Sequence, residues 1–380
     1  MGTPKIFNIF SIYYLSKDIL DGGFIKSFAP FHWFQVVLGS CRVDVRDSFA
    51  TTPTVWQKMY SALLMVLSSA AYVSFVFFYS SKLRGSVILL YILLALLGLH
   101  NLVNICNIFH VRFLNNDQNV QFLIGLHEID KSMGIDRKAY IHDVFYNVNV
   151  VTVVVWSLFP TGLFLFTLAS DWLEGVCYIW IYYSQITCAF EWTYFSNLIV
   201  YFYIRLRYIN SIMINHLGIE DSSYLKMYKF ITFMHKTTLK DLAAETGDFA
   251  SSDMVLYLNQ IFDALTRFTS LYRFQVNLGI DRFIGSIIWV GDFFILGVIC
   301  LRWDEFFFEL RETKNLATKI LATHTSGPLR KRASMMIKLI EESSPHFSVY
   351  DMWNMDPSTL LNMLGVLTTV TVTQLQFALL

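Results

Sequence analysis

Long apolar runs alternate with shorter polar stretches along most of the chain. Each run covers about twenty residues, the length at which an α-helix crosses a roughly 30 Å hydrocarbon core. The pattern predicts six helical spans, at Trp56–Tyr79, Ser86–Phe109, Phe145–Leu168, Gly175–Tyr203, Phe283–Leu301 and Thr359–Leu380. The expected fold class is therefore all-α, a polytopic membrane helical bundle.

The polar stretches divide the chain into segments. We expect a cytoplasmic N-terminal segment at 1–55, spans one to four within 56–206, a cytoplasmic loop with an amphipathic helix at 207–281, a fifth span at 282–302, a cytoplasmic anchor segment at 303–355 and the last helix at 356–380. The N-terminus lacks signal-peptide and myristoylation patterns, so insertion is assigned to the first internal span.

Composition supports a membrane protein. The chain has 380 residues, of which 55% are hydrophobic and 15% charged, whereas soluble domains carry about 25% charged residues. The net charge of zero gives no indication of nucleic-acid binding. The five Cys residues are interpreted as buried thiols. No spacing indicates a metal, a cofactor or a nucleophile–base pair, so we do not expect an enzyme.

Basic residues orient the spans. Lys and Arg are concentrated between spans two and three and after span four, which places these loops and the N-terminus in the cytoplasm of a multi-pass plasma-membrane protein. Basic residues also lie on both sides of Phe283–Leu301. One helix cannot begin and end on the same side, so the count of spans is one too few for this orientation.

The last helix is polar for a membrane span. Asp356 is a suitable N-cap and Pro357 suits the first helical position. No charge follows the cap, but polar side chains recur along the run at Asn362, Thr368, Thr369, Thr371, Thr373, Gln374 and Gln376. Gly365 lies near the middle, where it favours a bend or a close helix contact. Such a helix packs on other helices or lines a pore.

This C-terminal region resembles the insect gustatory receptor family. That family ends in Thr-Tyr, five further residues and Gln-Phe, and Thr369-Val370 and Gln376-Phe377 occupy these places here, with Val370 replacing Tyr. The stretches Phe347–Tyr350 and Met355–Leu361 are similar to the family's lead-in to its last helix. The resemblance extends more weakly to Leu258–Asn277 and Glu312–Leu321.

The resemblance implies a seven-helix chemoreceptor fold, of which six spans are clear here; Phe283–Leu301 is then a fusion of spans five and six. It also implies a ligand-gated, non-selective cation channel in gustatory sensory neurons, formed as a homo- or hetero-tetramer with other gustatory receptors. The last helix would line the pore, with Gln376, Phe377, Thr369 and Thr373 near the gate. The alternative for Gln376 is a hydrogen bond to a neighbouring helix.

The same resemblance implies a tastant site in the outer half of the bundle. The residues available there are mostly aromatic: Tyr91, Phe159, Phe164, Tyr178, Trp180, Tyr183 and Gln185. A small, mostly apolar molecule such as a bitter compound or a contact pheromone fits this set better than a sugar. Ordinary helix packing and lipid contact are the alternative roles of these residues.

Polar residues also lie within the spans. Glu191 and Asp292 are intramembrane carboxylates, which often have functional roles. Asn104 shares a helix face with Asn101 and Asn107. A polar seam between helices, in which either acid pairs with these Asn residues or with His100, is the favoured interpretation.

Other classes of protein remain as alternatives. An odorant-receptor subunit would share the fold and differ only in the detailed motif. A G-protein-coupled receptor would have an external N-terminus and usually Asp-Arg-Tyr after span three, where this chain has Ser170-Asp171-Trp172. A transporter would show internal repeats.

Overall fold

The computed structural model describes residues 19–82, 87–135, 139–170, 172–217, 254–285, 290–343, 348–349, 353–354 and scattered positions from 358 to 373. The main helices are α1 (Gly22–Val37), α2 (Val55–Lys82), α3 (Val87–Phe109), α4 (Asn116–Ser132), α5 (Ala139–Ser170), α6 (Trp172–Leu217), α9 (Met254–Gly285), α10 (Val290–Thr323) and α11 (Pro328–Ser343). Two short hairpins, β1–β2 and β3–β4, are the strands among these residues. The all-α prediction is confirmed.

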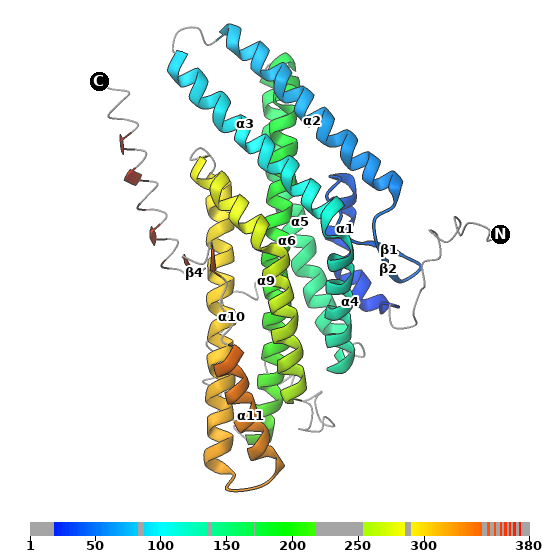
Figure 1. The fold of residues 1–380 in the computed structure, drawn as a ribbon, viewed down its shortest axis with the longest axis vertical. Coiled ribbons are helices and arrows are strands. Elements are labelled where there is room, and N and C mark those ends of the chain that lie inside the picture. The colour runs from blue at the N-terminus through cyan, green and yellow to red at the C-terminus, as the bar shows by residue number, and fades with distance from the viewer. Residues whose placement is uncertain are drawn as a thin grey trace, which may run out of the picture.

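The long helices run roughly along one direction and form an elongated bundle (Figure 1). At its lower end in that view, α10 and α11 fold back on each other beside the end of α6. Helix α6 has 46 residues, a length of about 69 Å at 1.5 Å per residue. It packs against α2, α3, α5, α9 and α10, so it is the central helix of the bundle.

Helix α1 begins at an N-cap, Asp21, whose carboxylate accepts a hydrogen bond from the Gly23 amide at 2.8 Å. After α1 the chain forms a hairpin from β1 (Asp44–Arg46) and β2 (Phe49–Thr51). The two turn residues, Asp47 and Ser48, both have positive φ, as the common two-residue hairpin turn requires. α1 packs mainly along α5 and also contacts α6.

Helix α2 presents an apolar face outward. Its exposed side chains include Val55, Trp56, Met59, Leu63, Val66, Leu67, Val73 and Phe77. Within the described residues, two helices are long and apolar enough to cross a membrane, at Val55–Phe77 and Ile141–Leu158, and only 17% of the first window is buried. They overlap predicted spans one and three, and begin one and four residues earlier.

The opposite face of α2 packs on α3 through small and polar groups. Ser68 donates to the Asn101 side-chain oxygen at 2.8 Å, and the Tyr72 hydroxyl donates to the Leu94 carbonyl at 2.9 Å. A Cβ at Gly98 would lie 2.6 Å from the Tyr72 hydroxyl oxygen. Gly98 therefore permits the close approach of the two helices.

Helix α3 continues into a π-helical turn, η2 (His110–Leu114), before α4 begins. The turn includes the fully buried Arg112, whose Nε donates to the Ser61 hydroxyl at 3.0 Å and whose Nη1 donates to the Cys41 carbonyl. A π-helical turn often occurs at a functional or strained position. Here it places the Arg112 guanidinium against the segment that joins α1 to the hairpin.

The apolar run Phe283–Leu301 is divided between two helices, because α9 ends at Gly285 and α10 begins at Val290. The hydropathy pattern predicted one span here and an amphipathic helix before it. Instead, α9 and α10 are both long, with 32 and 34 residues, and run in opposite directions (Figure 1). The expected helices at Leu258–Asn277 and Glu312–Leu321 lie inside them.

Aromatic side chains fill the core where α6, α9 and α10 meet. Phe195 and Phe268 stack with ring centroids 4.8 Å apart, and Tyr272 packs on both rings. Trp303 of α10 lies 6.3 Å from Phe268, centroid to centroid, and is 1% exposed. Aromatic pairs at these separations stabilise a core beyond the area that they bury.

Candidate functional site

A buried ion pair joins the segment after α1 to the middle of α6. Arg42 Nη2 lies 2.5 Å from Glu191 Oε2, and the two side chains are 6% and 3% exposed. Gln35 of α1 donates from Nε2 to the other Glu191 oxygen at 3.4 Å. The partners of Glu191 are thus Arg42 and Gln35. Among the described side chains, Glu191 is therefore bound by residues that the sequence interpretation did not name, and the side chain of the expected partner His100 lies outside the described part of the structure.

Two tyrosine rings enclose the Arg42 guanidinium. Its central carbon lies 4.4 Å from the Tyr272 ring centroid on α9 and 6.0 Å from the Tyr194 ring centroid on α6. A cation over an aromatic face is attracted by the ring quadrupole, and more strongly where water is excluded. Arg42, Glu191, Gln35, Tyr194 and Tyr272 are called the Arg42 cluster below.

The backbone near Arg42 is held from several sides. Gly39 has φ of 71°, and its carbonyl accepts from the Ser61 hydroxyl at 2.6 Å. Tyr183 donates its hydroxyl to the Leu38 carbonyl at 2.9 Å. Burial raises the pKa of the neighbouring Cys41 to about 11, so this thiol stays protonated at neutral pH. The loop from α1 to β1 is consequently a fixed element.

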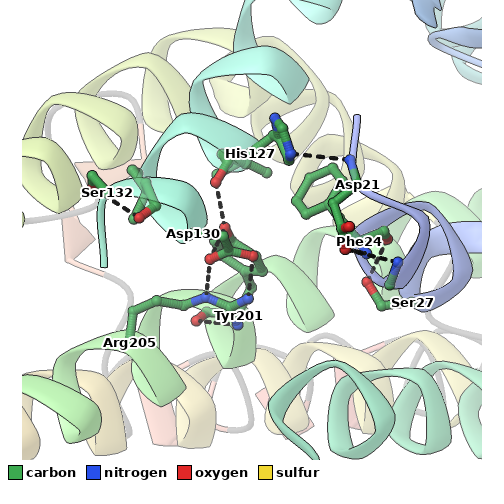
Figure 2. Close-up of polar contacts among 11 residues, drawn as sticks. Asp21, Phe24, Ser27, His127, Asp130, Ser132, Tyr201 and Arg205 are labelled. Carbon is green, nitrogen blue, oxygen red and sulfur yellow. Dashed lines mark hydrogen bonds and ion pairs between the residues drawn. The ribbon is translucent and has the colours of Figure 1, made fainter. Parts of the chain in front are cut away.

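A second buried ion pair lies between α4 and α6 (Figure 2). Arg205 donates from Nε and Nη2 to the two Asp130 oxygens at 2.9 and 2.8 Å, and both side chains are 1% exposed. The Tyr201 hydroxyl lies 2.8 Å from Asp130 Oδ1, and the Tyr201 ring lies 3.4 Å below the guanidinium carbon. Bidentate geometry of this kind fixes orientation as well as distance.

Helix α1 is attached to the same region. The Asp21 amide donates to His127 Nε2 of α4 at 3.0 Å, as Figure 2 shows, and the Asn149 side-chain amide of α5 donates to the Ser27 carbonyl at 2.7 Å. The start and the first half of α1 are therefore held by polar contacts to two different helices.

A polar ladder joins α6 to α10 toward the lower end of the bundle. Arg302 donates to the Ser196 hydroxyl at 2.8 Å and to the Asn197 side-chain oxygen at 2.5 Å, and Asn210 donates to Glu309 Oε1 at 2.9 Å. Burial raises the pKa of Glu305 to about 7 and also raises the pKa of Glu309. These acids sit on the part of α10 assigned to the cytoplasmic anchor segment.

A cavity of about 370 Å³ lies next to the Arg42 cluster. Side chains from α1, the hairpin, α4, α6 and α9 line it, and Gln57 at the start of α2 completes the wall. Most of the lining is apolar and aromatic, with polar groups at intervals. Pockets of this size and character are typical of small-molecule sites.

The predicted tastant site is only partly covered by the structure. Tyr91 is 68% exposed on α3, Phe164 of α5 packs edge-on against Tyr182 with centroids 5.5 Å apart, and Tyr183 is bound to the Leu38 carbonyl. The remaining four, Phe159, Tyr178, Trp180 and Gln185, lie in α5 and α6, but their side chains lie outside the described part of the structure. The three described side chains have different surroundings.

The other predicted residues have mixed outcomes. Asn104 is buried, and its Oδ1 lies 4.0 Å from Cys188 Sγ of α6, so a polar contact between α3 and α6 exists. The Asp292 side chain and the predicted gate residues Gln376 and Phe377 lie outside the described part. Among the residues that the structure describes, no group of three or more His, Cys, Asp or Glu residues is arranged to hold a metal ion.

The described positions of the last helix share one face. They are helical, exposed and spaced by three or four residues: Ser358, Leu361, Asn362, Gly365, Thr368, Thr369, Val372 and Thr373. The Thr369 hydroxyl donates to the Gly365 carbonyl and the Thr373 hydroxyl to the Thr369 carbonyl, each at 2.8 Å. Their hydroxyls are thus satisfied within the helix.

Sequence reasoning missed Arg42, Tyr272, Asp130 and Arg205. Arg42 lies in a segment assigned wholly to the cytoplasm, Arg205 was interpreted only as a basic residue that sets orientation, and no role was assigned to Asp130. Glu191 itself indicated that a basic side chain should be buried beside it, because an acid in an apolar helix needs a charged or hydrogen-bonding partner.

Comparison with known proteins gives no relative. No family model matches the chain, and no curated protein matches it significantly.

Proposed function

We propose that this chain is a chemoreceptor subunit of the insect gustatory receptor type, which assembles into a ligand-gated, non-selective cation channel in the plasma membrane. The observation that carries the proposal is the C-terminal segment. Its sequence has the Thr369 and Gln376-Phe377 positions of the family signature, and its described positions, Thr369 among them, are helical and exposed in the single chain.

The exposed face of the last helix supports assembly. In one chain that face is uncovered, and it mixes hydroxyl and amide groups with Leu361 and Val372. Hydroxyl and amide groups suit the wall of a shared, water-filled path, because polar groups facing lipid are costly. A tetramer around this helix would bring together equivalent faces of each subunit.

The division of Phe283–Leu301 supports seven crossings. If the later part of α9 and the first part of α10 each cross, they supply the crossing that the hydropathy count lacked. The N-terminus and the basic anchor segment would both be cytoplasmic, and the last helix would run outward. The outward apolar face of α2 would contact lipid.

The ligand of the channel would be a small organic tastant, a bitter compound or contact pheromone rather than a sugar, bound near Phe164 and its neighbours. An odorant-receptor-type subunit is the second candidate, because it would share the bundle and the exposed last helix. The ligands that open the channel separate these two candidates.

Expression in oocytes tests the proposal. Surface-expressed protein should give a cation current when candidate tastants are applied, and mild cross-linking in the membrane should yield tetramers. Surface-expressed protein that stays monomeric and passes no current for a broad tastant panel contradicts the channel assignment.

A further inference from the structure

The cavity beside the Arg42 cluster is built from segments that are far apart in the sequence. Phe24, Phe28 and Trp33 come from α1, Phe122 comes from α4, and Tyr272 comes from α9. These aromatic side chains form apolar walls around a volume of about 370 Å³. The cavity is separate from the outer aromatic residues assigned above to the tastant.

The cavity has a closed, polar side and an open side. Arg42, Gln35 and Tyr272 are buried at 5%, 4% and 1% exposure, and Arg42 is bound from behind by Glu191. Trp33 is the most exposed of the lining residues, at 69%. A molecule would therefore enter beside Trp33 and reach the Arg42 cluster with its inner end.

The charges of the lining compensate each other. Arg42 is paired with Glu191, and Asp44 is paired with Arg46 at 2.6 Å. Burial lowers the pKa of His32, so its imidazole is neutral at pH 7. An anion or a cation would have to compete with a formed ion pair, whereas an uncharged molecule leaves both pairs intact.

Polar groups of the lining offer a few hydrogen bonds to such a molecule. Amide side chains line it at Gln35, Gln57 and Asn119, and Tyr194 and Tyr272 line it next to Arg42. A mostly apolar pocket with a few placed polar groups orients a ligand by one end. The remaining ligand surface would be covered by the aromatic walls.

We infer that this cavity is a second small-molecule site, which binds an uncharged, mostly hydrocarbon or aromatic compound bearing one hydroxyl or carbonyl group directed at the Arg42 cluster. A ligand there touches α1, α4, α6 and α9 at once. Its binding therefore stabilises the docking of α1 on the bundle.

Photolabelling of the purified full chain in nanodiscs tests the site. The probe is 4-(trifluoromethyl-diazirinyl)benzyl alcohol, which is uncharged, aromatic and carries one hydroxyl. Labelled residues are mapped by peptide mass spectrometry. We expect saturable labelling of α1 and of α9 near Tyr272, displaced by excess 4-(trifluoromethyl)benzyl alcohol. The corresponding diazirinyl benzoate anion should label these segments about tenfold less.

Two variants give a matched comparison. Ala29→Phe places a ring in the cavity wall and should reduce the saturable labelling about tenfold, whereas Ala70→Phe adds the same ring to the exposed face of α2 and should leave it unchanged. Monodisperse elution in size-exclusion chromatography confirms folding. If Ala29→Phe does not fold, Val36→Trp blocks the same wall.

Three results overturn the inference. The first is labelling that does not saturate, or that is confined to the exposed face of α2. The second is equal labelling of Ala29→Phe and the original chain. The third is stronger labelling of the cavity by the benzoate than by the alcohol. The inference is also overturned if a bound acyl lipid is extracted from the protein and the probe labels the cavity only after this lipid has been removed.

Discussion

The buried charged residues Arg42 and Glu191 affect the stability of the chain because they are removed from water. Arg42 and Glu191 lose most of their hydration, and their attraction offsets that loss only because the pair is close and Gln35 binds the second Glu191 oxygen. A buried pair of this kind contributes little net stability compared with apolar side chains of the same volume. Removing one partner alone is what destabilises.

Arg42→Met should lower the free energy of unfolding by about 3–5 kcal/mol, because Glu191 would remain buried without its cation. The double variant Arg42→Met/Glu191→Leu should recover most of this loss. Denaturant unfolding of protein in detergent micelles measures both values. A double variant no more stable than Arg42→Met would show that the lost stability does not come from leaving the Glu191 carboxylate buried without its cation.

Glu305 makes stability depend on pH. The carboxyl has a pKa of about 7 in the folded chain, raised mainly by burial, against the ordinary 4.5. Arg302 opposes this shift and Asp304 adds to it. The folded state therefore holds a proton that the unfolded state releases, so this contribution to stability is full below pH 4.5 and declines as pH rises to about 7.

Glu305→Gln should remove that decline, and Asp263→Asn, at an exposed carboxyl of α9, serves as a control. Thermal unfolding at intervals from pH 4.5 to 7.5 gives the comparison. We expect the gap in melting temperature between Glu305→Gln and the original chain to widen toward pH 7 and then stay constant. A gap independent of pH would mean that Glu305 does not titrate in this range.

At the scale of elements, periodicity predicted helices well and their ends poorly. Spans one to four fall inside α2, α3, α5 and α6, because an apolar run and a helix share the same core-facing or outward-facing side chains. The polar extensions of α6 and α10 were not predicted, because their charged residues were assigned to cytoplasmic loops. Likewise, Gly285 and Ser286 gave too weak a break to divide the fifth run.

The connection from α1 to the hairpin depends on glycine at one position. Gly39 has φ of 71°, and a Cβ there would lie 2.7 Å from Leu64 Cδ1. Gly39→Ala should therefore destabilise the chain by about 1–3 kcal/mol. Gly162→Ala, in helix α5 with nothing within 4 Å, should instead stabilise by about 0.5–1 kcal/mol. Denaturation curves of the two variants measure both changes in the free energy of unfolding. Equal changes for Gly39→Ala and Gly162→Ala would contradict the need for glycine at position 39.

The whole molecule is a bundle with a central helix, and its described residues include two buried ion pairs whose partners lie far apart in the sequence. In the proposed channel, orientation and span number would depend on where α9 and α10 turn, and the pore would depend on how several chains meet. The candidate site could be predicted only at Glu191, because its partners come from segments more than a hundred residues away. A hydropathy pattern describes neighbouring residues, so it cannot predict pairs between segments this far apart.

The proposed seven crossings would place the two ends of the chain on opposite sides of the membrane. An epitope tag after Leu380 should bind antibody on intact cells, whereas a tag at the N-terminus should bind only after permeabilisation. A C-terminal tag that also requires permeabilisation would contradict the proposed count of crossings.

In an assembled channel, Gln376→Ala should change the sodium-to-potassium permeability ratio or the basal leak, because it removes an amide from the proposed gate. Thr318→Ala, an exposed residue of α10 in the anchor segment, is the control and should leave both unchanged. Whole-cell recordings in oocytes measure both quantities. Identical ratios and leak in Gln376→Ala would remove this residue from the pore.

The ion pair between Arg42 and Glu191 also sets an order of events during synthesis. The two residues are separated by 149 positions, so Arg42 leaves the ribosome long before its partner exists. Until α6 has been made, α1 and the hairpin have no final place to dock, and a cation that will end buried must wait in water or at the lipid surface. Closing so long a loop is slow compared with local helix formation. The beginning of the chain can therefore reach its final position only after α6 has been made, and a chain interrupted before α6 would leave its N-terminal aromatic residues open to chaperones and quality control.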